Sequence, residues 1–308
     1  MKVGILGGGQ LGRMLATAAH ELGLRPVIVE PRPDCPASRV APTLAVAYDD
    51  PAALRALADC DVVTYEFENV PAAAVRHLAG IVAVHPSPDA LTSTADRLLE
   101  KRLFRSLGMP TPRFAAVDSE RGLRHAIEHV GLPAVLKTRR FGYDGKGQAR
   151  LHTLADAAPA WRRLGGQPSI LEQLVAFDRE ISLIAVRGRD GTIRFWPPTE
   201  NRHVDGILRI ARAPVEDLDP AAVEPARRAM TRLLERLDYV GVLTVEFFVC
   251  GGAWLANEAA CRVHNSGHWT LEGAVTSQFE NHLRAVAGWP LGATDAIAPV
   301  AMANVVGH

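Results

Sequence analysis

The stretch Val3-Gly4-Ile5-Leu6-Gly7-Gly8-Gly9-Gln10-Leu11-Gly12 decides the fold class of this chain. Residues 3–6 form a short apolar run typical of a buried strand, and a helical pattern continues from about Arg13 to Leu22. Residues 26–30 form a second strand-like run. A strand, a helix and another strand in this order predict a βαβ unit and a parallel sheet.

Outward from this opening, short strands are expected at residues 44–47, 62–65 and 82–84, with a boundary at the prolines of residues 86–88. We therefore predict an N-terminal Rossmann-like domain over residues 1–90. A helix is predicted over residues 91–107, because Gly108 and Pro110 form a normal helix stop.

The pattern changes after residue 110, so a second domain is expected over residues 91–308. Strand-like residues 134–137 and 148–151 flank a glycine-rich loop, which indicates a small antiparallel lobe at about 110–170. Further predicted elements are strands at 170–175, 180–186, 241–249 and 254–258 and a helix at 221–237. The expected class is α/β, with separate α+β lobes after the parallel sheet.

Composition argues against several classes of function. The formal net charge is +0, so no surface for nucleic acid or membrane is indicated. No apolar run approaches the roughly 20 residues that a membrane span needs. The 4 cysteines lack zinc-site spacing, which favours reduced thiols and a cytoplasmic protein.

The glycines Gly7, Gly9 and Gly12, followed by Glu30 at the end of the second strand, match a dinucleotide fingerprint. The same pattern fits another phosphate at a helix N-terminus, or a tight turn without any ligand.

A second glycine-rich stretch, residues 141–148, follows Lys137. Its exposed amides and lysines could fold over a polyphosphate, although a solvated hairpin tip is the alternative. It is not a P-loop, because Gly147 stands where Ser or Thr should follow Lys146.

Two acidic residues provide the third signal. If the turn comprises the five residues Cys250–Trp254, Glu246 faces Glu258 across the ladder. Two opposed carboxylates repel unless a cation lies between them, and oxygen ligands with an open side suit Mg²⁺ bound to nucleotide phosphates. A register shifted by one residue would instead place the acids on opposite faces.

With these residues, the chain resembles the 5-(carboxyamino)imidazole ribonucleotide synthases of the ATP-grasp superfamily over almost its whole length. The motifs that carry the resemblance are Gly8–Met14, Tyr65–Asn69, Phe141–Gln148 and His264–His268, the last just after Asn257-Glu258. The resemblance implies an ATP-grasp fold.

The resemblance also implies an ATP site with Mg²⁺ held by Glu246 and Glu258. The residues implied for ATP are Arg97, Lys137, Gly142, Tyr143, Asp144, Gly145, Lys146, Gly147, Gln148, Glu172, Gln173, Leu174, Val175, Glu180, His203, Asn257 and Glu258. Within this set, the backbone of residues 172–175 would pair with adenine and Glu180 would hold the ribose.

For the second substrate, 5-aminoimidazole ribonucleotide, the resemblance implies contacts from several separate segments of the chain. The implied residues are Gln10, Leu11, Glu66, Tyr143, Asp144, His264, Asn265 and Ser266, with the first glycine turn on the monophosphate. The implied catalytic residues are Asp144, Lys146 and Arg262. Asp144 is either the base for the substrate amine or a turn cap. His264 and His268 have a zinc-like spacing without its glutamate, so substrate hydrogen bonds or core positions are the other interpretations.

The implied activity is carboxylation of 5-aminoimidazole ribonucleotide with ATP and bicarbonate, through carboxyphosphate, by a homodimer. Alternatives are a nicotinamide-dependent oxidoreductase, a formate-dependent glycinamide ribonucleotide transformylase and a non-catalytic nucleotide-binding module. Two departures from the family are Cys261 in place of a proline and Lys146 in place of an arginine. The family also has a further C-terminal segment, so we expect ATP binding but weak carboxylation.

Overall fold

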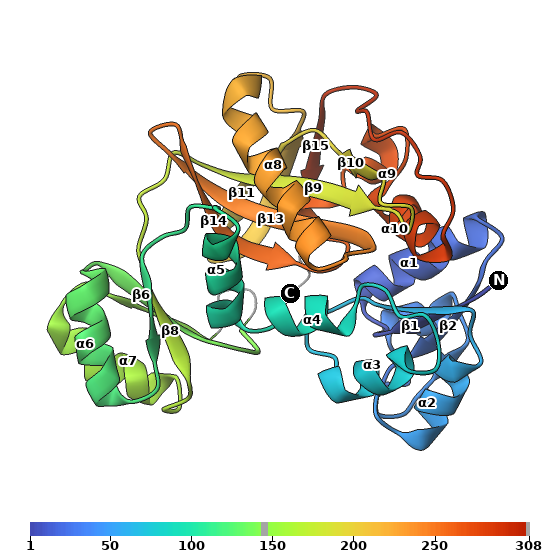
Figure 1. Cartoon of the computed structure of the whole chain (residues 1–308), viewed down its shortest axis with the longest axis horizontal. Helices are drawn as coiled ribbons and strands as arrows, with labels where there is room; N and C mark the ends of the chain where they lie inside the picture. The colour runs from blue at the N-terminus through green and yellow to red at the C-terminus, as the bar shows by residue number, and fades with distance from the viewer. Residues whose placement is uncertain (143–146, 306–308) are drawn as a thin grey trace.

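The computed structural model describes residues 1–142 and 147–305, which fold around three β-sheets (Figure 1). The first sheet is parallel, with strand order β3-β2-β1-β4. Its strands are β1 (Lys2–Leu6), β2 (Arg25–Val29), β3 (Thr43–Leu44) and β4 (Val62–Tyr65), and its helices are α1 (Gln10–Glu21), α2 (Pro51–Ala58) and α3 (Ala72–Ala79). The predicted βαβ opening is confirmed, because β1 and β2 pair in parallel across α1.

Two predictions near the end of this sheet were wrong. Residues 82–84 form no strand and contribute only a single parallel bridge between Val63 and Val84. The predicted helix over 91–107 is two helices, α4 (Pro88–Thr94) and α5 (Arg97–Ser106). The break occurs because the side chain of Asp96 accepts the amide hydrogens of Leu98 and Leu99 and so starts a new helix.

The second sheet is antiparallel and small, with strand order β5-β8-β6-β7. Its elements are β5 (Phe114–Val117), α6 (Glu120–Val130), β6 (Ala134–Thr138), β7 (Gln148–Leu151), α7 (Ala157–Arg163) and β8 (Ser169–Gln173). Both helices lie beside this sheet at one end of the molecule (Figure 1). The strands expected on either side of the glycine-rich loop are confirmed as β6 and β7.

The third sheet is the largest, with order β14-β13-β9-β11-β12-β15 and β10 beside β9. Its strands are β9 (Arg179–Arg187), β10 (Ile193–Phe195), β11 (Thr199–Val204), β12 (Ile207–Ala213), β13 (Gly241–Cys250), β14 (Ala253–Ala260) and β15 (Val300–Ala303). The accompanying helices are α8 (Pro220–Arg236), α9 (Thr270–Gly273) and α10 (Gln278–Ala287). The sequence patterns did not indicate β10, β11, β12 or β15. In the described part of the chain, no helix is both long and apolar enough to cross a membrane.

A buried histidine on α10 joins the parallel sheet to the large sheet. His282 Nδ1 accepts the amide hydrogen of Val242 at 3.1 Å, and its Nε2 lies 2.8 Å from Thr64 Oγ1. Because Nδ1 is an acceptor, the hydrogen of the neutral ring lies on Nε2 and is donated to Thr64. Burial, aided by the nearby His85, lowers the pKa of His282 to about 3, so the ring remains neutral in the folded protein.

The neutral ring predicts a loss of stability in mild acid. An unfolded histidine has a pKa of about 6.5, so below that pH the unfolded chain binds a proton that the folded chain does not. This single group should lower the free energy of unfolding by up to about 1.4 kcal/mol per pH unit as the pH falls from about 6.5 towards 5. Urea unfolding of the wild type and of His282→Asn at several pH values measures the effect. The variant should show a flatter pH dependence, and equal slopes would contradict the assignment.

Candidate active site

A cavity of about 1300 Å³ is lined by residues of the small sheet and the large sheet, together with residues of α1 and of the segment that follows β4. It brings together most of the residues implied for ATP, the imidazole nucleotide, the metal and catalysis. Those that line it are Gln10, Leu11, Arg97, Lys137, Gly142, Gln148, Glu172, Gln173, Leu174, Val175, Glu180, His203, Glu246, Asn257, Glu258, Arg262, His264 and Asn265. Three others, Glu66, Gly147 and Ser266, do not line it, and Tyr143, Asp144, Gly145 and Lys146 lie outside the described residues.

The two acidic residues of the β13–β14 hairpin face each other, as predicted. The reason differs from the predicted five-residue turn. Cys250 pairs with Ala253, so the turn contains only Gly251 and Gly252, whose φ values of 54° and 82° suit a tight two-residue hairpin turn. A bulge after Glu246 then shifts the register by one residue and restores its pairing with Glu258.

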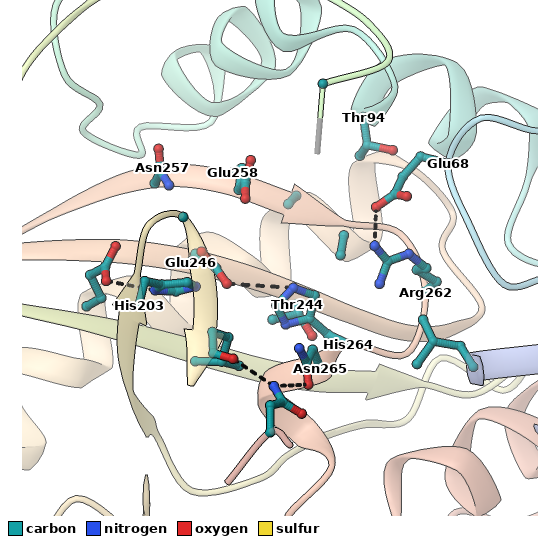
Figure 2. A pocket seen from close by; sticks show the side chains of 18 of the residues that line it. Glu68, Thr94, His203, Thr244, Glu246, Asn257, Glu258, Arg262, His264 and Asn265 are labelled. Atoms are coloured by element: carbon teal, nitrogen blue, oxygen red, sulfur yellow. Dashed lines mark hydrogen bonds and ion pairs between the residues drawn. The ribbon is translucent and has the colours of Figure 1, made fainter. Parts of the chain in front are cut away.

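The opposed carboxylates are electrostatically unfavourable by themselves. Burial, and next the charge of Glu258, raise the pKa of Glu246 to about 8. The side chain of Asn257, beside them on the bulge, has a buried Oδ1 without a partner among the described residues. Both glutamates and Asn257 line the cavity (Figure 2). Carboxylate and amide oxygens that converge in this way fit a hard divalent cation.

The donor set leaves room for further ligands. Within residues 1–142 and 147–305, no group of three or more His, Cys, Asp or Glu side chains that could hold a metal ion is present. A cation at Glu246 and Glu258 would therefore take its remaining ligands from water or from a bound phosphate, which is how Mg²⁺ commonly binds with nucleotides.

Two of the cations that line the cavity lie on α5 and β6. Arg97, at the start of α5, donates to the carbonyl oxygen of Gly142 at 2.9 Å and lies 3.8 Å from Glu258. Lys137, on β6, has its Nζ 3.2 Å from Glu172 Oε2. Both cations are placed where they could contact an anion that enters the cavity.

Lys101 is a buried cation that the sequence patterns did not reveal. Its Nζ lies 3.3 Å from Glu172 Oε2, so Glu172 is shared by Lys101 and Lys137. Burial alone would raise the pKa of Glu172, but the two ammonium groups outweigh it and hold the pKa at about 2. The sequence feature that could have revealed Lys101 is its four-residue spacing from Arg97, which places these two residues on one face of α5.

His203 and Glu180 form a pair on adjacent strands. His203 Nδ1 lies 2.8 Å from Glu180 Oε2, and both side chains line the cavity. Burial disfavours the charged imidazole, but the hydrogen bond to Glu180 and the negative charges of Glu246, Glu180 and Glu258 together outweigh it and raise the pKa of His203. The two residues implied separately for ATP thus form one unit.

His264 approaches Glu246 from the side away from His203 (Figure 2). Its Nδ1 accepts the amide hydrogen of Ser266, so the neutral ring carries its hydrogen on Nε2. The Nε2 atom lies 3.6 Å from Glu246 Oε1 (Figure 2). Burial, followed by the charge of Arg262, lowers the pKa of His264 well below its usual value. Residues 265–267 form only a 3-10 turn, so the zinc-type helix is absent from this described segment.

Two polar contacts fix residues that neighbour His264 in the chain, Arg262 and Asn265. Arg262 Nη2 lies 2.7 Å from Glu68 Oε1, which links the end of β14 to the Tyr65–Asn69 motif (Figure 2). Asn304 Nδ2, which the sequence analysis missed, donates to Asn265 Oδ1 at 2.9 Å. Asn304 also lines the cavity.

In the first glycine turn, where a monophosphate is expected, backbone amides bind protein side chains. The amides of Gly9 and Gly12 donate to the carboxylate of Glu66 at 2.7 and 2.8 Å, so a protein acid already occupies the anion position. The amide of Gly8 donates to Glu30, which also accepts from Tyr48 and Arg32. The turn follows the glycine fingerprint, but its donors hold side chains.

Comparisons with known proteins agree with this architecture. The ATP-grasp domain family matches residues 102–279, and the ribonucleotide synthetase preATP-grasp domain family matches residues 1–94. An N5-carboxyaminoimidazole ribonucleotide synthase of Pseudomonas aeruginosa is 50% identical over 312 residues, which cover 100% of this chain and 85% of that protein.

Solved structures give the same result. N5-carboxyaminoimidazole ribonucleotide synthetase of Thermus thermophilus superposes with a TM-score of 0.95 at 50% identity, covering 99% of this chain and 84% of that one. The Aspergillus clavatus synthase, solved with ADP and 5-aminoimidazole ribonucleotide, has a TM-score of 0.91 at 30% identity and covers 100% of this chain and 82% of that one. The predicted α/β class, with an ATP-grasp fold after a Rossmann-like sheet, is confirmed. The chain therefore belongs to the N5-carboxyaminoimidazole ribonucleotide synthase family of ATP-grasp ligases.

Proposed function

We propose that this chain carboxylates 5-aminoimidazole ribonucleotide with ATP and bicarbonate, releasing ADP and phosphate, in purine biosynthesis. Membership of the synthase family supports the reaction. The observation that carries the site assignment is the pair of opposed carboxylates, Glu246 and Glu258, in a cavity that also contains Arg97 and Lys137. That combination suits a polyphosphate bound together with a cation.

ATP would lie between the small sheet and the large sheet. Glu246 and Glu258 would hold Mg²⁺, which supplies charge neutralisation on the phosphates. Arg97, Lys137 and the loop that includes Gly142, Gly147 and Gln148 would contact the phosphates, while residues 172–175 would bind adenine. The Glu180–His203 pair would orient the ribose. Tyr143, Asp144, Gly145 and Lys146 remain sequence-based assignments.

The imidazole nucleotide would occupy the other end of the cavity. Gln10, Leu11, His264, Asn265 and Arg262 line this end. Ser266 would act behind His264 by fixing its ring, and Glu66 would shape the glycine turn rather than contact a phosphate. Asp144 is proposed as the base for the substrate amine, with Lys146 and Arg262 as the other catalytic residues.

The chemistry proceeds in two steps. Bicarbonate attacks the γ-phosphate of ATP, forming carboxyphosphate and releasing ADP, with Arg97 and Lys137 balancing the charge on the phosphate oxygens. The exocyclic amine of 5-aminoimidazole ribonucleotide then attacks the carboxyl carbon of carboxyphosphate and loses a proton. The bond between that carbon and the phosphate oxygen breaks, and inorganic phosphate is released. Carboxyphosphate hydrolyses readily, so exclusion of water from the cavity conserves ATP.

The assembly and location are further parts of the proposal. The homodimer follows from the family resemblance, whereas a domain division near residue 90, with a lid lobe at about 110–170, follows from the sequence pattern. Cys35, Cys60, Cys250 and Cys261 are all free thiols, which supports a reducing cytoplasm.

An assay of ADP formation with each substrate omitted in turn tests the function. We expect ADP only when ATP, bicarbonate and 5-aminoimidazole ribonucleotide are all present, with N5-carboxyaminoimidazole ribonucleotide formed in equal amount. Formate in place of bicarbonate should not support turnover. ADP formation driven by formate and glycinamide ribonucleotide would instead establish the transformylase alternative.

The oxidoreductase alternative is disfavoured by the glycine turn itself. A dinucleotide site needs free amides for the pyrophosphate and a free acid for the ribose. Here the amides of Gly9 and Gly12 hold Glu66, and Glu30 is bound by Gly8, Tyr48 and Arg32. Titration with NADH should accordingly give no change in its fluorescence.

A further inference from the structure

One face of α5 contacts β14 on both sides of Glu258. Arg97, Glu100 and Lys101 are spaced i, i+3 and i+4, so their side chains emerge from the same face of the helix. Arg97 approaches the Glu258 side chain, whereas the other two bind the backbone of β14. Figure 1 shows α5 between the small sheet and the edge of the large sheet that β14 forms.

Lys101 binds the strand before Glu258. Its side chain is 1% exposed, and its Nζ donates to the carbonyl oxygen of Ala256 at 3.2 Å and to that of Asn257. With Glu172 as the third acceptor, all three ammonium hydrogens have partners. A fully buried lysine is retained only when its charge and its donors are satisfied in this way.

Glu100 binds the strand after Glu258. Its Oε1 accepts the amide hydrogen of Ala259 at 2.7 Å, and its side chain is also buried. The two neighbouring residues of α5 therefore hold β14 at Ala256, Asn257 and Ala259, which bracket Glu258.

The segment that they hold is the bulge. Phe247 pairs with Ala256 and Glu246 pairs with Glu258, so Asn257 is the extra residue. Consecutive residues of a regular strand point to opposite faces, yet Asn257 and Glu258 both line the cavity. Loss of the bulge would shift the register by one residue and turn Glu258 away from Glu246.

We propose that Glu100 and Lys101 are positioning residues, which clamp the β14 backbone around the Asn257 bulge and so direct Glu258 towards a divalent cation bound with the nucleotide. The inference rests on the proposed function for the identity of the ligand. Neither side chain needs to touch the nucleotide, because both act through the backbone of β14.

The test is equilibrium binding of Mn²⁺ to the full chain in the presence of ADP, followed by the electron paramagnetic resonance signal of free Mn²⁺. Glu100→Ala removes the acceptor for Ala259, whereas Glu100→Gln keeps an acceptor oxygen at the same place. Lys101→Met removes the donors to Ala256 and Asn257 with little change in length. Phe104→Leu is the matched control, because Phe104 is a buried apolar residue of the same helix.

We expect Glu100→Ala and Lys101→Met to raise the Mn²⁺ dissociation constant by about tenfold or more, as for other residues that orient metal ligands. Glu100→Gln should remain within about threefold of the wild type. Phe104→Leu should lower the melting temperature without weakening Mn²⁺ binding. If Lys101→Met does not fold, the Glu100→Ala and Glu100→Gln pair decides the question.

Wild-type Mn²⁺ affinity in a folded Glu100→Ala variant would overturn the inference, as would equal weakening by Phe104→Leu. These outcomes are separate from failure of the proposed function. That failure would appear as the absence of ADP formation by the wild type with bicarbonate and 5-aminoimidazole ribonucleotide, whatever the Mn²⁺ constants.

Discussion

Replacing Glu258 by glutamine should lower kcat for ADP formation by about 10³-fold or more, because the transferred phosphate loses the charge neutralisation that the cation supplies. The free energy of unfolding of the metal-free protein should not decrease, because the substitution removes a like charge that faces Glu246. Activity and stability should therefore change in different ways. Steady-state ADP formation and urea unfolding without metal measure the two effects.

A matched control for this experiment is Glu224→Gln, which alters an exposed glutamate on α8 that does not line the cavity. It should leave kcat unchanged. Normal turnover by the Glu258→Gln protein would show that the cation does not bind at the proposed site. A marked loss of stability would instead indicate that Glu258 serves as a structural partner of Arg97.

Replacing Arg262 by methionine should lower both stability and activity. Arg262 and Glu68 are 17% and 25% exposed, so the pair is largely shielded from water. Removing one partner should cost about 2–3 kcal/mol of unfolding free energy, because Glu68 is left without its cation. The side chain also lines the cavity beside His264, so kcat/KM for 5-aminoimidazole ribonucleotide should fall by about 10²-fold.

A double-mutant cycle separates these two roles. Glu68→Gln and the double variant should reveal a coupling energy of about 1–3 kcal/mol in unfolding measurements. Glu68→Gln should retain more activity than Arg262→Met, because it keeps the guanidinium in the cavity. Coupling energy near zero would show that the contact contributes nothing to the link between β14 and the Tyr65–Asn69 motif.

Some features of the fold were predictable from local sequence. The βαβ opening follows from an apolar run, a glycine turn and a helical pattern, all of which act over a few residues. The helix over 91–107 was wrongly predicted as continuous because its apolar pattern continues through Asp96. The competing preference of Asp96 for a helix N-cap is equally local, so that error could have been avoided.

The acid pair was predicted correctly, although the predicted turn was wrong. Alternation along β13 and β14 places Glu246 and Glu258 near each other, but a two-residue turn alone would misalign them by one position. The bulge at Asn257 corrects the alignment, and its backbone is held by side chains of α5. No pattern within the hairpin encodes that contact.

The sequence by itself determined the βαβ opening, the presence of two acids on one hairpin and the family, because these depend on spacing along the chain. Tertiary structure alone decided that Glu66 fills the glycine turn and that Lys101 is buried beneath the cavity. Gly9 and Glu66 are 57 positions apart, and Lys101 and Asn257 are 156 apart. Hydrogen bonds over such separations form only when whole elements pack together. Which acceptor each donor finds therefore depends on the assembled fold.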